Sequence, residues 1–364
     1  MSYWKQSFDQ PIASAFQSII ESNLNRKDLL PNFSCNIDSG HDKITGSVPK
    51  FFSNYLKEEY SLFFGRKILL QKLDINNAIM FCAERPWMFK DPGRGIFFSS
   101  IVTAVYSVCA KYEGEDERDI NSLLLHDAVR NMNDFCKLVE YHDSFKERPD
   151  IFWAPTTASE GKIGADLALL FHRKLGVNDW YSVALLQGKK NLNINGTCSI
   201  SRGDDGTSQL NRLISSGMSY YVFYQQPGQR NAGGISCIPA TVKTANEVFL
   251  EYSKSLKLST NSLSGDSLCS LCEFIFNQVF ETDYSNMRTF SNPEDALACL
   301  QQQRDLKAMV ALSAASSPAF EKLKILCANH ALIDESKMIS VPIISPPPPP
   351  PPPSHDDKPP GMGR

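Results

Sequence analysis

The alternation of apolar and polar positions predicts strands in the middle of the chain and helices on either side. Apolar residues fill most of 165–171 and 181–189, which is typical of strands that are buried on both faces. Two shorter apolar runs, 150–155 and 220–224, also favour strands. Residues 119–141 instead carry apolar side chains at helical spacing. The centre of the chain therefore predicts a mixed unit that begins with an amphipathic helix.

These elements define a central unit between two helical regions. With a helix over 208–216, the order becomes helix, three strands, helix and strand. We therefore expect an α/β (α+β) unit at 118–240, a helical region at 1–117 and a second helical region at 241–340. The acidic run 113–117 marks the first boundary, because consecutive acids favour a solvated linker.

The last residues, 341–364, differ in composition from the rest of the chain. Eight consecutive prolines occupy 346–353. Such a run favours a polyproline II rod of roughly 25 Å. Proline lacks an amide donor and cannot join a helix interior or a central strand. We expect a disordered proline-rich tail, and binding of a partner protein is the role that its composition favours.

Composition narrows the class of protein. The chain has 364 residues, 42% of them hydrophobic and 21% charged, which is ordinary for a globular protein. The N-terminus lacks an apolar signal region, and the longest apolar-rich stretch, 101–110, is too short to span a bilayer. Ten cysteines show no framework spacing. These features predict a cytoplasmic protein without membrane contact. The net charge of −3 means that any contact with nucleic acid must come from local basic patches.

Three polar residues stand out within the two longest apolar runs. Asp166 begins one predicted strand, and Gln187 and Lys189 lie near the end of the next. Side chains two residues apart share a face of a strand, so Gln187 and Lys189 point the same way. If the strands pair, Asp166 converges with them at one edge of the sheet. A carboxylate, a carbonyl oxygen and an ammonium can bind a hard divalent cation and stabilise negative charge beside it.

These residues carry a resemblance to a known family. Asp166 with Gln187-x-Lys189 resembles the core of the PD-(D/E)xK nucleases, and the Gln-x-Lys form is similar to their Mrr-type branch. The string from Glu160 to Asp166, together with Gln209-x-x-x-Leu213, resembles uncharacterised restriction-like proteins of bacterial defence loci. The similarity covers roughly residues 118 to 226.

The resemblance implies a fold, an activity and a cofactor. It implies a restriction endonuclease-like αβββαβ core and a nuclease that depends on Mg²⁺ or Mn²⁺. DNA is favoured over RNA as the substrate, and the biological role implied is that of an effector of anti-phage defence. The catalytic residues implied are Asp166, Gln187, Lys189 and Glu160, of which Asp166, Gln187 and Glu160 would bind the metal.

Further residues are candidates for binding the substrate. Lys190 and Arg212 are cations near the motif and are candidate phosphate contacts. Each is also compatible with an ordinary surface charge. Gln209 opens the helix after the motif strands, and the resemblance implies that it supports the site or touches the substrate. An exposed helix start is the alternative for Gln209.

Two departures from the family pattern leave a second function open. Gly164-Ala165 stands where the family has a proline, and Gln187 replaces an acid, so the site carries one negative charge fewer. The alternative is a catalytically inactive adapter that keeps the fold and binds a partner protein through its proline-rich tail. The helical flanks would serve sensing, partner docking or assembly into a homo-oligomer.

Overall fold

The computed structural model describes most of the chain between residues 92 and 340. The described ranges are 92–111, 117–138, 149–156, 165–190, 197–198, 200, 206–225, 239–255, 258–259, 269–280, 287–301, 306, 308–315, 317–329 and 333–340, with isolated positions 15, 18–20, 79, 83–84, 86 and 89 before them. Glu160 and the proline-rich tail lie outside these residues, as does most of the predicted N-terminal region.

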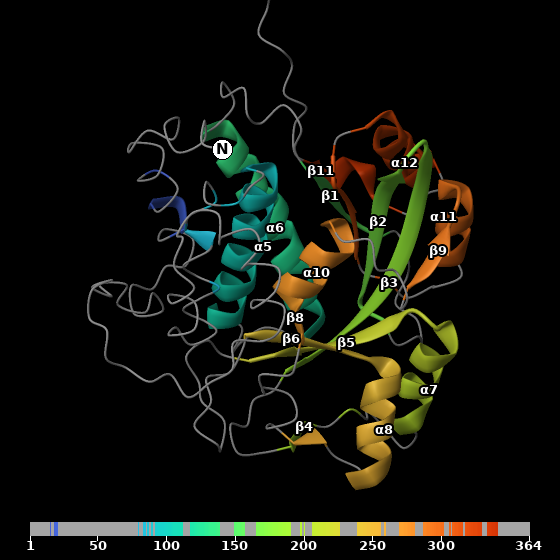
Figure 1. Cartoon of the computed structure of the whole chain (residues 1–364). Coiled ribbons are helices and arrows are strands. Elements are labelled where there is room, and N and C mark those ends of the chain that lie inside the picture. The colour runs from blue at the N-terminus through green and yellow to red at the C-terminus, as the bar shows by residue number, and fades with distance from the viewer. Residues whose placement is uncertain are drawn as a thin grey trace, which may run out of the picture.

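A mixed sheet of nine strands forms the centre of the molecule (Figure 1). Its order is β11-β1-β10-β2-β3-β5-β6-β8, with β9 on β3. The strands are β1 (Asp150–Pro155), β2 (Leu167–Leu175), β3 (Asn178–Lys190), β5 (Ser219–Tyr224), β6 (Ala240–Thr244), β8 (Cys269–Ser270), β9 (Arg288–Phe290), β10 (Ala308–Ser313) and β11 (Ile339–Ser340). A separate pair joins β4 (Thr197–Cys198) to β7 (Leu258–Ser259). Strand β3 runs parallel to β5, and β10 runs parallel to β2.

Helices cover both faces of the sheet (Figure 1). One hydrophobic cluster joins one face to α5 (Pro92–Lys111), α6 (Glu117–Leu138) and α10 (Leu271–Phe280). A second cluster joins the other face to α7 (Gly206–Ser216), α8 (Ala245–Ser255), α11 (Pro293–Gln301) and α12 (Pro318–Asn329). A short 3-10 helix, Glu335–Lys337, precedes β11. The result is a three-layer arrangement, which explains why the central strands are apolar on both faces.

The long hairpin β2–β3 follows directly from its sequence. Leu175 pairs with Asn178, so Gly176 and Val177 form a two-residue turn. Gly176 has a φ of 63°, in the left-handed region that tight hairpin turns require and that glycine adopts without strain. Residues 167–171 of β2 are buried, in keeping with their apolar run, and the burial extends over His172 and Arg173.

The mixed α/β (α+β) class is confirmed, and the central elements fall close to their predicted positions. β1 occupies 150–155 as expected. α6 and α7 correspond to the two predicted helices, and β5 corresponds to the last predicted strand. β2 begins at Leu167, two residues later than predicted, and runs on to Leu175.

The predicted helical region at 241–340 contains strands as well as helices. This region supplies α8, α10, α11 and α12, but also most of β6 and all of β8, β9, β10 and β11 of the main sheet. β10 lies between β1 and β2, so those two strands are not neighbours. The sequence of β10, Ala-Met-Val-Ala-Leu-Ser, is buried at all six positions. A short run that is apolar throughout has no periodicity to separate strand from helix.

Helix α5 is longer than the apolar run recognised in the sequence. Its window Gly93–Ala110 is long and apolar enough, by length and composition, to cross a membrane. In the folded chain 89% of that window is buried inside the protein, packed against α6 and α10. In this fold α5 serves as an interior helix.

Candidate active site

The candidate site lies where β3 extends past the beginning of β2. The ladder between these strands ends at the pair Leu167 and Leu186, and the rest of β3 pairs with β5 alone. Asp166 immediately precedes β2, and its backbone N–H donates to the carbonyl of Leu186 at 2.9 Å. The Asp166 side chain therefore faces backbone and side-chain groups of β3 that lie beyond its ladder with β2.

One carboxylate oxygen of Asp166 is the centre of a buried hydrogen-bond network. Asp166 is 6% exposed. Its Oδ2 accepts from Gln187 Nε2 at 2.7 Å, from the Gly188 backbone N at 3.1 Å and from Asn121 Nδ2 at 3.2 Å. Three N–H donors on one oxygen favour the ionised form of a buried carboxylate. The predicted convergence of Asp166 with Gln187 is thus present in the fold.

The charge of Asp166 fixes the direction of every bond around it. An ionised carboxylate only accepts, so Gln187 and Asn121 must each turn an amide nitrogen towards it. Their oxygens then face outwards: Gln187 Oε1 accepts from Gln209 Nε2 at 3.0 Å, and Asn121 Oδ1 accepts from the Tyr224 hydroxyl. Burial raises the pKa of Tyr224 well above its ordinary value, helped by Cys109 and Asp166, so the hydroxyl keeps the proton that it donates.

The network crosses the end of the sheet from one helix layer to the other. Tyr224 ends β5, and Asn121 lies in the first turns of α6. On the opposite face Gln209 belongs to α7. Asp166 and Gln187 join the two sides. We refer to Tyr224, Asn121, Asp166, Gln187 and Gln209 as the Asp166 network.

The predicted cations have different surroundings. Lys189 is 3% exposed and lies two residues after Gln187 in β3, on the same face by alternation. Lys190 ends β3 and is half-buried. Arg212 is exposed on α7, one turn after Gln209. Burying an ammonium group costs free energy. Lys189 is the most buried of the three predicted cations.

Two members of the network were not among the residues predicted from the sequence. Asn121 lies in a helix whose buried side is otherwise largely apolar, and it is buried itself. Asn121 lies on the same side of the helix as Leu124, Leu125 and Ala128. A polar residue among these apolar ones could have identified it, because a buried amide needs a hydrogen-bond partner. Tyr224 sits inside an apolar aromatic strand, and nothing in its sequence context separates it from Tyr220 or Tyr221.

The donor set suits a hard cation in kind. Mg²⁺ prefers carboxylate and amide oxygens. Asp166 supplies a carboxylate, and Gln187 and Gln209 carry amide oxygens within the same network. Within the described ranges, no group of three or more His, Cys, Asp or Glu side chains is clustered to hold a metal. Glu160, the second predicted acid, lies outside those ranges, so Asp166 is the carboxylate on which the proposal depends.

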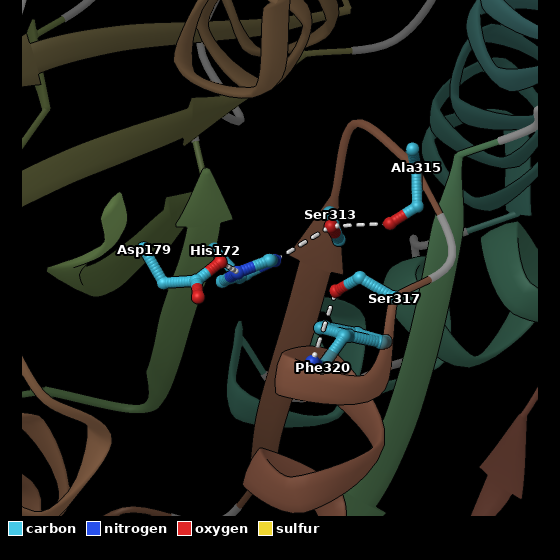
Figure 2. A network of polar contacts seen from close by, with 6 residues as sticks. All are labelled: His172, Asp179, Ser313, Ala315, Ser317 and Phe320. Atoms are coloured by element: carbon cyan, nitrogen blue, oxygen red, sulfur yellow. Dashed lines mark hydrogen bonds and ion pairs between the residues drawn. The ribbon is translucent and has the colours of Figure 1, made fainter. Parts of the chain in front are cut away.

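A second polar network lies at the opposite end of the β2–β3 hairpin (Figure 2). His172 Nε2 is 2.9 Å from Asp179 Oδ1, and His172 Nδ1 is 2.8 Å from Ser313 Oγ. Nε2 must carry a proton, because the carboxylate only accepts. A neutral ring then accepts from the Ser313 hydroxyl. A protonated ring would donate to Ser313 Oγ, whose own O–H would then donate to the carbonyl of Ala315 at 2.8 Å.

By residue type this His172 network matches a serine nucleophile with its base and carboxylate. Its burial argues against that chemistry. His172 and Ser313 are each 2% exposed, whereas the Asp179 side chain is 35% exposed and lines an open pocket. A nucleophile must reach its substrate, and here the serine is buried as deeply as the histidine. The network ties β2, β3 and β10 together.

No protein-family model, curated protein or solved structure matches the chain.

Proposed function

We propose that the protein is a Mg²⁺-dependent nuclease that hydrolyses phosphodiester bonds, with DNA favoured over RNA. One observation carries the proposal: Asp166 and Gln187 are joined by a 2.7 Å hydrogen bond at the end of β3, two residues before the buried Lys189. These are the residues through which the sequence resembles the PD-(D/E)xK nucleases. A role as an effector of anti-phage defence is part of the same proposal.

The order of elements supports the proposal independently of the motif residues. Apart from the short β4, which belongs to the separate two-stranded sheet, α6, β1, β2, β3, α7 and β5 follow in the order helix, three strands, helix and strand. The site lies at the carboxyl ends of the parallel strands β3 and β5, where ligands commonly bind in open α/β sheets. β10 enters the sheet between β1 and β2, on the side of β2 away from β3 and β5, so it leaves the pairing of β2, β3 and β5 intact.

Each residue has a role in the proposed reaction. Asp166 would hold the cation, with Glu160 as the further ligand implied by the resemblance. Gln187 would join them only by turning its amide, so that Oε1 leaves Gln209 and replaces Nε2 beside Asp166. A bound Mg²⁺ would act as a Lewis acid and activate water. Lys189 would offset the negative charge that develops on the phosphate. Gly188 anchors Asp166 through its backbone N–H, and Gln209 orients the Gln187 amide.

The matched pair Asp166→Asn and Asp179→Asn tests the proposal. Both carboxylates accept hydrogen bonds at opposite ends of the same hairpin, and both changes preserve side-chain shape. Supercoiled, linear and single-stranded DNA, and RNA, are incubated with each protein in Mg²⁺ and in EDTA. We expect metal-dependent cleavage by the wild type and by Asp179→Asn, and at least about a hundredfold loss for Asp166→Asn, the scale seen when a stabilising group is removed from an active site.

Two results would contradict the proposal. Cleavage by Asp166→Asn at the wild-type rate, with both proteins purified identically, would exclude Asp166 from the chemistry. A folded wild-type protein that cleaves none of the substrates under any metal condition would instead favour the inactive adapter, in which the proline-rich tail binds a protein.

A further inference from the structure

We infer that Asn121 and Tyr224 are positioning residues for Asp166: Asn121 holds the carboxylate directly, and Tyr224 acts only through Asn121. The inference rests on the proposed function for its catalytic consequence. Neither residue was implied by the sequence resemblance. Both are identified by the hydrogen bonds that reach Asp166 from α6 and from the end of β5.

Asn121 has one stable orientation in this site. Its side chain is 1% exposed, so water does not solvate its amide freely. Nδ2 lies 3.2 Å from Asp166 Oδ2, and Oδ1 accepts from Tyr224. The reversed amide would place Oδ1 against a carboxylate oxygen and Nδ2 against a hydroxyl that has to accept instead of donate. The first of these contacts is repulsive, so the observed orientation is strongly favoured.

Tyr224 decides how firmly that orientation is held. Its hydroxyl is the donor that satisfies Asn121 Oδ1. Without it, the buried amide oxygen loses its partner and the amide gains freedom to turn. Tyr224 itself makes no described hydrogen bond to Asp166, so its influence on the carboxylate passes through Asn121. The orientation of Asp166 is thus predicted to depend on Asn121, and that of Asn121 on Tyr224.

The remaining contacts explain why α6 has to take part. Gln187 and Gly188 approach Asp166 from β3, its neighbour in the sheet. Asn121 approaches from the helix layer packed on the sheet, and so fixes the carboxylate against rotation out of the sheet end. Partners that orient a metal-binding carboxylate typically change metal affinity or activity by about 10- to 100-fold when removed.

The functional test uses Asn121→Leu, Tyr224→Phe and the double variant, with Tyr220→Phe as the matched control. Leucine is close to asparagine in size, and phenylalanine keeps the tyrosine ring. Tyr220 is a buried tyrosine on the same face of β5 but packs against Phe274. Cleavage is measured against Mg²⁺ and against substrate concentration.

Asn121→Leu should lower kcat about 10- to 100-fold with little change in the KM for nucleic acid, because Asp166 is displaced while the phosphate contacts remain. Tyr224→Phe should lower kcat about fivefold, the effect of one neutral hydrogen bond. The double variant should be no slower than Asn121→Leu, and Tyr220→Phe should match the wild type. Multiplication of the two single effects in the double variant would overturn the dependence of Tyr224 on Asn121.

A second measurement does not require catalysis. Unfolding equilibria in EDTA are compared for Tyr224→Phe, Asp166→Asn and their combination, first with Asn121 present and then in Asn121→Leu. We expect the two substitutions to be coupled by about fivefold in the unfolding constant when Asn121 is present, and to be additive without it. Additivity in both backgrounds would overturn the inference. Coupling in a wild-type protein that cleaves nothing would support the positioning geometry while refuting the nuclease proposal.

Discussion

The two ends of the β2–β3 hairpin each carry a polar network, and they differ in which member is buried. At one end the buried centre is the Asp166 carboxylate, which accepts three N–H groups. At the other end the buried members are His172 and Ser313, and the Asp179 side chain reaches partly into solvent. The first arrangement keeps a negative charge inside the sheet end, where β3 also carries the buried Lys189. The second fixes neutral groups between strands.

The comparison shows that residue type alone is a poor guide to chemistry. His172, Ser313 and Asp179 have the composition of a catalytic triad, yet the serine cannot reach a substrate from its position. The Asp166 network looks unremarkable by type, since three of its five members are amides. Its distinguishing property is electrostatic: a buried carboxylate is held by three N–H donors at the end of the strand that carries the buried Lys189.

The largest expected effect is at Lys189. Lys189→Met keeps the apolar stem but removes the ammonium, so the charge that develops on phosphate loses its partner. We expect cleavage to fall at least about a hundredfold. Lys174→Met is the matched control, because Lys174 is exposed in β2 near His172. Equal cleavage rates for Lys189→Met and Lys174→Met on the same DNA would show that the two ends of the hairpin do not differ in their role in cleavage.

Gln187→Glu should make the stability of the protein depend on metal. The change replaces the Nε2 donor, 2.7 Å from Asp166 Oδ2, with a second carboxylate. In EDTA the like charges and the lost donor should lower stability by about 2 kcal/mol. Mg²⁺ should restore more stability to this variant than to the wild type. Thermal unfolding across a Mg²⁺ titration measures the effect, and parallel curves for both proteins would show that Gln187 does not face the cation.

The His172 network should affect stability without affecting cleavage. Ser313→Ala should cost about 1 kcal/mol, the value of a typical hydrogen bond, and leave the cleavage rate unchanged. Denaturant titration and the nuclease assay on one preparation separate the two effects. A Ser313→Ala protein that is fully stable but inactive would reverse the roles assigned to the two networks.

Acid should weaken the His172 end specifically. Burial lowers the pKa of His172 below its ordinary value of 6.5, although Asp179 opposes the shift. The unfolded chain therefore takes up a proton at a pH where the folded chain does not. The free energy of unfolding should fall as the pH drops below about 6.5, and His172→Gln should lose this part of the pH dependence. Identical pH profiles for the two proteins would contradict the assignment.

The smallest expected effect is at Arg212. The residue is exposed on α7, the helix that also carries Gln209. If it contacts phosphate, Arg212→Ala should weaken nucleic-acid binding a few-fold and reduce the slope of log affinity against log salt by about one. Binding to a labelled duplex over a range of salt concentrations measures the slope. An unchanged slope would mean that Arg212 is an ordinary surface charge.

Several features could be predicted from the sequence because they depend on local patterns. The apolar runs of β2, β3 and β5 identify buried strands, and the spacing along α6 identifies an amphipathic helix. Alternation places Gln187 and Lys189 on one face of β3. Pairing of two neighbouring strands is then enough to bring Asp166 to Gln187, because the connecting hairpin fixes the register.

Other features were decided only by the tertiary structure, because they depend on contacts between distant segments. The position of β10 between β1 and β2 joins residues more than a hundred positions apart, and its uniformly apolar sequence has no period to reveal it. Asn121 reaches Asp166 across 45 positions, and Tyr224 reaches Asn121 across 103. Local patterns determine which surfaces an element buries, but the packing of one layer on another determines which polar group meets the carboxylate.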